Sequence, residues 1–77
     1  MLPPPNPKIL DEKLRSFKDA ARSFGRTYQA VYDMVQNGRC DHNGKLVRLE
    51  WCQAEWGRAT SEEAIARFRR RLNGLEA

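Results

Sequence analysis

Polar side chains that could hydrogen-bond to nucleic-acid bases recur along residues 27–36 at the spacing of one helix face. These side chains belong to Thr27, Gln29, Tyr32, Asp33 and Gln36. Amides, hydroxyls and carboxylates match the donors and acceptors that base edges present in the major groove. Val31, Met34 and Val35 fall on the opposite face as an apolar stripe. The pattern predicts a helix that buries one face and offers the other to a ligand.

Positive charge is in moderate excess, and most of it is arginine. The chain has 77 residues, with 14 Lys and Arg against 10 Asp and Glu, a net charge of +4 and a pI near 9.5. Arginine makes bidentate contacts to phosphate and to guanine. Its densest cluster runs from Arg67 to Arg71, where Arg67, Arg70 and Arg71 are candidates for phosphate contact. A solvated face that complements the helix dipole explains the same cluster equally well.

The residue types needed for catalysis or metal binding do not come together. Cys40 and Cys52 lack the paired spacing of a zinc site, and Cys40 with His42 would supply two ligands where a closed site needs four. No nucleophile has a nearby histidine base. We therefore expect no enzyme activity, no cofactor, no metal and no small-molecule substrate, and two reduced thiols in a cytosolic protein.

Two helices joined at a glycine are expected to position the polar face. Asp11 can cap a first helix that starts at residue 12, or Ser16 can cap a shorter one over 17–24. Gly25 follows, at a position that often needs a left-handed backbone. The second helix should run from Thr27, its N-cap, to about Gln36 and stop at Asn37-Gly38.

A β-hairpin is predicted directly after the second helix. Short extended runs at 39–41 and 45–49 flank His42-Asn43-Gly44, and Asn-Gly between such runs is a strong hairpin signal. Residues 50–57 suit either a short helical turn that closes the core or a loop. Their two tryptophans, Trp51 and Trp56, are assigned to packing in preference to base stacking.

A basic amphipathic helix should close the chain. Thr60 as N-cap and Glu63 at the third helical position fit a capping box, and Asn73-Gly74 can stop the helix. Its apolar stripe comprises Ala64, Ile65, Phe68, Leu72 and Leu75. Phe68 and Leu72 belong either to the core or to a dimer seam, which would compensate for the small core of so short a chain.

The spacing of Ala21, Gly25 and Val31 is the most specific pattern in the chain. Residues 16–49 resemble the helix-turn-helix domains of the excisionase and MerR-like kind, including those in small subunits of phage terminases. The stretch AARSFGRTYQAVYDMVQNGR carries the helix pair, and NGKLVRL continues into the hairpin. In such domains the second helix enters the major groove, and the hairpin, or wing, touches the adjacent backbone or minor groove.

Carried over residue by residue, the resemblance implies two sets of DNA contacts. The groove-facing set is Thr27, Tyr28, Gln29, Tyr32, Asp33 and Gln36. The second set is the wing contacts Arg39, Asn43 and Lys45. Apart from the resemblance, Arg26, Arg39 and Lys45 are expected to fix the helix on phosphates. Two positions depart from the family: Arg26 stands where a small aliphatic residue is usual, and Asp33 adds a negative charge to the reading face.

Together these patterns predict a mostly α fold with a small β-hairpin, a winged helix-turn-helix of three to four helices. Residues 1–10 form a proline-rich flexible leader, 11–57 the helix-turn-helix with its wing, and 58–77 the basic helix. We expect a small sequence-specific protein that binds double-stranded DNA, a transcription regulator or a recombination or packaging factor of a phage or mobile element. The alternative is an adaptor that uses the same scaffold to bind a protein.

Further expectations concern partners and location. A homodimer through the C-terminal helix, or a protein partner, would supply additional contacts. The start of the chain lacks the basic and apolar regions of a signal peptide, and no stretch approaches the length of a membrane span. These features predict a cytoplasmic protein of a bacterium or a phage-infected host, with no membrane partner.

Overall fold

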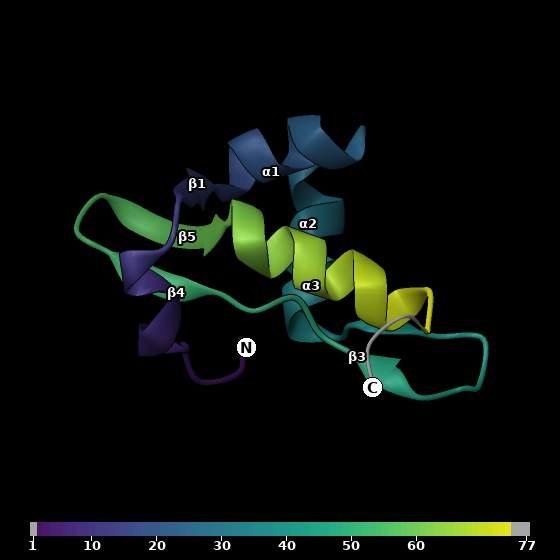
Figure 1. The fold of residues 1–77 in the computed structure, drawn as a ribbon. Coiled ribbons are helices and arrows are strands. Elements are labelled where there is room, and N and C mark those ends of the chain that lie inside the picture. Colours follow the sequence, from purple (N-terminus) through teal and green to yellow (C-terminus); the bar gives the residue numbers. More distant parts are fainter. Residues whose placement is uncertain (1, 75–77) are drawn as a thin grey trace.

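The chain alternates helices with short antiparallel strands (Figure 1), in a computed structural model that describes residues 2–74. The elements are η1 (Pro7–Asp11), β1 (Leu14–Ser16), α1 (Phe17–Phe24), α2 (Tyr28–Gln36), β2 (Arg39–Cys40), β3 (Leu46–Val47), β4 (Cys52–Ala54), β5 (Gly57–Ser61) and α3 (Glu62–Leu72). Strands β1, β5 and β4 form an antiparallel sheet in that order, and β2 pairs with β3 in a separate hairpin. Three α-helices agree with the prediction, but the sheet makes the fold mixed α/β rather than mostly α.

Short-range capping explains where α1 and α2 begin and end. Ser16 Oγ accepts the N–H of Asp19 at 3.1 Å, so α1 takes the shorter of its two predicted spans. Gly25 ends it in the left-handed region at φ 65°, as expected. Thr27 Oγ1 then accepts the N–H of Ala30 at 3.2 Å and starts α2.

The strand β1 replaces the helical start that the longer alternative required. Leu14 pairs with Ser61 and Ser16 with Ala59, so residues 14–16 form an edge strand of the sheet. The partner strand lies more than 40 residues away in the sequence. A local pattern of apolar spacing carries no information about that partner.

The helix α3 begins one residue later than predicted. Ser61, not Thr60, is its N-cap, and Ser61 Oγ accepts an N–H of the first helical turn at 2.8 Å. Thr60 is fully buried and donates its hydroxyl to the carbonyl oxygen of Glu50 at 2.8 Å. Glu63 accepts the N–H of Lys13 instead of closing a capping box. Because Thr60 is buried in the sheet and its hydroxyl is bonded to Glu50, it does not cap α3.

One apolar core lies among the three helices and the segment that follows β3. Its buried members are Phe17, Ala20, Ala21, Val31, Met34, Val35, Val47, Leu49, Trp51, Ile65 and Phe68. Phe68 is a core residue and not part of a dimer seam, because it is 2% exposed. Leu72 packs half-buried against the same core, and Leu75 lies outside the described residues.

The proline-rich start of the chain is packed, although a flexible leader was predicted. Trp51 Nε1 donates to the carbonyl oxygen of Pro3 at 2.8 Å, and the N–H of Asn6 donates to the carbonyl oxygen of Trp51 at 2.7 Å. Ile9 is buried against the sheet beside Cys52. Burial of an apolar side chain and two long-range hydrogen bonds thus fix this segment on the fold.

A charged network joins α3 to the two segments that precede β1 and β4, through Glu12 and Glu50. Arg67 Nε donates to Glu50 at 2.8 Å, and its two terminal nitrogens donate to the Glu12 carboxylate at 2.9 and 3.0 Å. Ser61 Oγ donates to Glu12 at 2.6 Å, and Asn6 Nδ2 donates to Glu50 at 2.8 Å. The hydrogen bonds from Arg67 and Ser61 hold the pKa of Glu12 below its ordinary range.

Acid is expected to destabilise the fold partly through Glu12. A carboxyl group whose pKa is lower in the folded than in the unfolded chain stabilises the fold while it is ionised. That contribution is complete above the ordinary pKa of 4.5 and is lost as the pH falls through the folded value. Glu12→Gln should be less stable at neutral pH and lose less stability on acidification. Urea unfolding at about pH 7 and about pH 3 measures both effects, and equal acid sensitivity in the two proteins would assign it to other carboxyls.

Candidate nucleic-acid interface

Helix α2 presents its predicted polar face to solvent. Val31, Met34 and Val35 are buried on the other side of the helix. Gln29 is exposed and Gln36 is half-buried. Within residues 2–74 neither glutamine side chain has a hydrogen-bond partner. Two amide groups on this face are therefore available to a ligand.

Asp33 and Arg39 neutralise each other at the end of α2. Asn37 Nδ2 donates to one oxygen of the Asp33 carboxylate at 2.6 Å, and Arg39 Nη1 donates to the other. These two bonds hold the pKa of Asp33 below its usual range, so its carboxylate is ionised and paired at neutral pH. The negative charge of Asp33 is thus offset within the chain. Arg39, predicted as a phosphate contact, is instead directed toward α2.

An additional hairpin, formed by β4 and β5, lies beside α2. Its register pairs Cys52 with Ala59 and Ala54 with Gly57. The guanidinium of Arg58 stands over the ring of Tyr32 on α2, 5.4 Å from the ring centroid. Residues 52–54 and 57 are thus strand, so residues 50–57 as a whole form neither the helical turn nor the loop that the sequence left open. The alternation of buried Cys52 and Ala54 with an exposed residue between them is the period-2 signal that could have revealed the strand.

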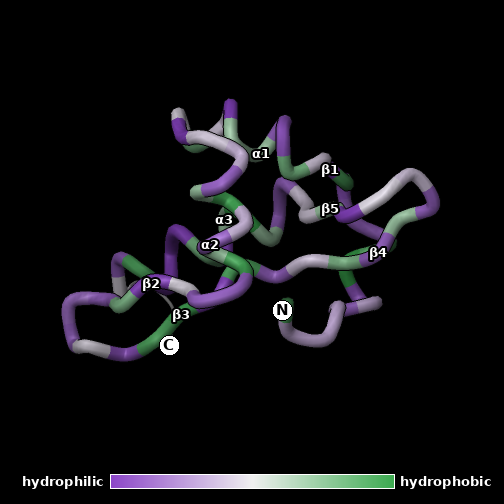
Figure 2. Tube along the Cα trace, turned by 180° about the vertical axis from the view of Figure 1, so that it is seen from behind, coloured by the Kyte–Doolittle hydropathy of each residue, from purple (hydrophilic) through white to green (hydrophobic). Residues whose placement is uncertain are grey.

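The predicted hairpin after α2 is also present, with a shorter ladder than expected. Only Arg39 with Val47 and Cys40 with Leu46 pair across it. Asp41 Oδ1 accepts the N–H groups of Asn43 at 2.8 Å and Lys45 at 2.9 Å, which shapes the tip. Asn43 and Lys45 are exposed there. Figure 2 shows α2 between the two hairpins, one on either side.

Two exposed aromatic side chains, Trp56 and Tyr28, line one hollow at the start of α2. Trp56, in the turn between β4 and β5, is 59% exposed, so the expectation that it packs in the core is wrong. Tyr28, a predicted contact, opens α2 and is 46% exposed. Both side chains line one hollow together with Lys18 and Arg58. Sequence reasoning missed Trp56 and Arg58, because the register of β4 with β5 brings them beside α2, and it also missed Lys18 in the first turn of α1.

The C-terminal arginines have contacts within the fold. Arg67 is held by two glutamates and is 22% exposed, so it has a structural role that was not predicted. Arg71 Nη1 lies 3.8 Å from Glu50, and Arg69 Nη2 donates to the carbonyl oxygen of Ser23 at 3.0 Å. Arg70 is exposed on the same helix. In Figure 1, the ribbon of α3 lies in front of that of α2.

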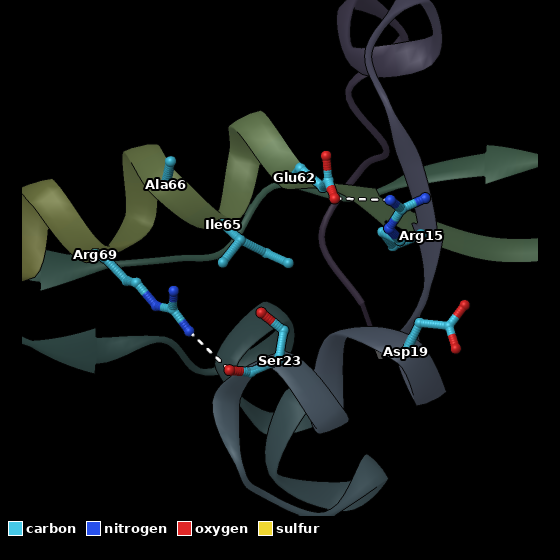
Figure 3. Close-up of a pocket in the computed structure, with 7 residues that line it drawn as sticks. All are labelled: Arg15, Asp19, Ser23, Glu62, Ile65, Ala66 and Arg69. Atoms are coloured by element: carbon cyan, nitrogen blue, oxygen red, sulfur yellow. Dashed lines mark hydrogen bonds and ion pairs between the residues drawn. The ribbon is translucent and has the colours of Figure 1, made fainter.

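A pocket of about 360 Å³ opens between α1 and α3 (Figure 3). Arg15 donates to Glu62 at 2.7 Å at one end, and Arg69 reaches α1 at the other. Ile65 forms part of the lining between them. Both arginines of this pocket have partners within the fold: Arg15 joins β1 to α3, and Arg69 joins α3 to α1.

Across residues 2–74 no three His, Cys, Asp or Glu side chains gather as metal ligands. Cys40 is exposed, whereas Cys52 is buried, and burial raises the pKa of its thiol. None of the helices described has both the length and the hydropathy needed to cross a bilayer.

Comparisons of the chain with protein-family models, with curated proteins and with solved structures found no match.

Proposed function

We propose that this chain is a double-stranded DNA-binding protein of winged helix-turn-helix architecture, in which α2 enters the major groove. The observation that carries the proposal is the amide pair of Gln29 and Gln36, neither of which has a hydrogen-bond partner within residues 2–74, on a helix flanked by two hairpins. A helix fits the major groove, and a glutamine amide can bond bidentately to adenine. The α1–turn–α2 unit supports this docking because its cap residues hold α2 at the surface of the core.

Three cations without an ion-pair partner lie on the segments that flank α2 in the sequence or in the fold. Arg26 lies in the turn before α2, Arg58 on β5 beside Tyr32, and Lys45 at the tip of the β2–β3 hairpin. Within the part of the chain that the structure describes, none of these three has an ion-pair partner. Phosphate contacts from such side chains fix the register of a protein on the duplex. The pairing of Asp33 with Arg39 supports the same docking, because it removes an uncompensated charge that would repel phosphate.

The proposal extends to the biological role. A sequence-specific regulator, or a recombination or packaging factor of a phage or mobile element, would use α2 to read bases and the hairpins to hold the backbone. A single module of this size buries on the order of 600–1,000 Å² of surface on DNA. Tight binding would therefore need a second copy or a protein partner.

Arg26→Ala and Arg58→Ala are each expected to weaken binding to duplex DNA and to reduce its salt dependence. Loss of one phosphate contact lowers the slope of log affinity against log salt by about one. Fluorescence anisotropy with a labelled random duplex at several salt concentrations measures this slope. Lys13→Ala is the matched control, because Lys13 pairs with Glu62 at the start of α3 and is 74% exposed there.

Absence of duplex binding by the wild-type chain at low salt would contradict the proposal and leave the adaptor role. An equal loss of slope in Lys13→Ala would show that the protein binds through net charge and not through α2.

A further inference from the structure

Two of the large apolar side chains that face solvent share one site. In residues 2–74 the exposed large apolar side chains are Leu10, Tyr28, Leu46 and Trp56. Isolated exposed leucines are common on protein surfaces, whereas a tryptophan that is more than half exposed beside an exposed tyrosine marks a binding surface. Tyr28 and Trp56 are the two that line the same hollow.

The hollow between them is built from three separate elements. It has a volume of about 470 Å³ and lies among the start of α1, the start of α2 and the turn of the β4–β5 hairpin. The ring of Tyr28 rests against the buried Phe17, with 6.0 Å between centroids. Tyr28 is therefore held in a fixed orientation, while Trp56 has no ring partner within residues 2–74.

Two cations line the same hollow as these aromatic side chains. Lys18 and Arg58 line the hollow, and neither has a carboxylate partner within the part of the chain described. Gln53 adds an amide group, whose nitrogen donates to the carbonyl oxygen of Ala54 at 3.3 Å and whose oxygen remains available. Aromatic faces with adjacent cations match a nucleotide, in which a flat base carries an anionic phosphate.

We propose that this hollow binds one unpaired nucleotide next to the duplex that α2 reads. The base stacks on Trp56, and its phosphate pairs with Lys18 or Arg58. The inference rests on the proposed DNA binding and specifies its substrate: a duplex with an unpaired base beside the site, as at an overhang or a junction. A base inside an intact duplex cannot offer its face to a side chain without unstacking, which gives the unpaired nucleotide its advantage.

The test compares a blunt duplex with the same duplex extended by a few unpaired nucleotides at either the 3′ or the 5′ end. Wild-type protein should bind one of the extended duplexes about tenfold more tightly than the blunt one, as expected for a single stacked base. Trp56→Ala should abolish this preference and keep its affinity for the blunt duplex, and Trp56→Phe should restore most of it. Leu10→Ala removes an apolar side chain of similar exposure, 45%, on η1 and should behave as the wild type.

The fluorescence of the wild-type protein supplies a second readout. Trp51 is buried, so quenching by an extended duplex reports Trp56. Equal affinity for blunt and extended duplexes, or a preference that survives in Trp56→Ala, would overturn the inference while the proposed duplex binding stood. Failure to bind any of the duplexes would overturn both.

Discussion

Gly38→Ala is expected to destabilise the fold by about 3 kcal/mol, the sum of a left-handed backbone penalty and a backbone clash. Gly38 has φ +77° and is buried where the chain leaves α2. A Cβ atom there would lie 2.5 Å from the carbonyl oxygen of Val47 on β3. Because that neighbour is backbone, the β2–β3 hairpin must move away from α2 to make room. Urea or thermal unfolding followed by circular dichroism measures the loss.

Gly44→Ala separates the two contributions. Gly44 has nearly the same backbone angle, φ +79°, at the tip of the same hairpin, but a Cβ atom there meets nothing within 4 Å. Only the left-handed penalty of about 1 kcal/mol is expected for this control. Equal losses for the two variants would show that the close approach of Gly38 to β3 contributes nothing.

Arg67→Met is expected to cost roughly 2 kcal/mol of unfolding free energy, because it leaves two carboxylates facing each other without their shared cation. Arg67, Glu12 and Glu50 are each only 22–23% exposed, so solvent replaces the lost guanidinium poorly. The partial exposure places the cost below that of a fully buried pair. The same substitution should also loosen the contact of the chain start with the sheet, because Glu50 accepts a hydrogen bond from Asn6.

Arg15→Met is the matched control for Arg67→Met. Arg15 pairs with Glu62 at 2.7 Å, a shorter distance than any hydrogen bond that Arg67 itself makes, but both side chains are 44–46% exposed. An exposed pair contributes less than about 1 kcal/mol. If chemical denaturation shows equal losses for the two variants, burial does not determine the strength of the Arg67 network.

The sequence indicated much of the candidate site on α2 and little of what surrounds it. Gln29 and Gln36 follow from helical spacing, because their exposed face is the complement of the buried stripe. Arg58 and Trp56 do not, because their position beside α2 depends on a strand pairing that joins distant residues. The ion pair between Asp33 and Arg39 could not be predicted from the sequence either, because it depends on the direction in which the chain leaves α2.

Local chemistry in the sequence by itself determined the capped helices and their glycine ends. Ser16, Thr27 and Gly25 act within one turn of their own positions, so short-range hydrogen bonds and backbone angles were enough. Only the tertiary structure decided that Leu14–Ser16 is a strand, that Thr60 is buried, and that Arg67 joins two glutamates. Each of these depends on contacts between residues 10 to 55 positions apart, which exist only after the sheet has assembled.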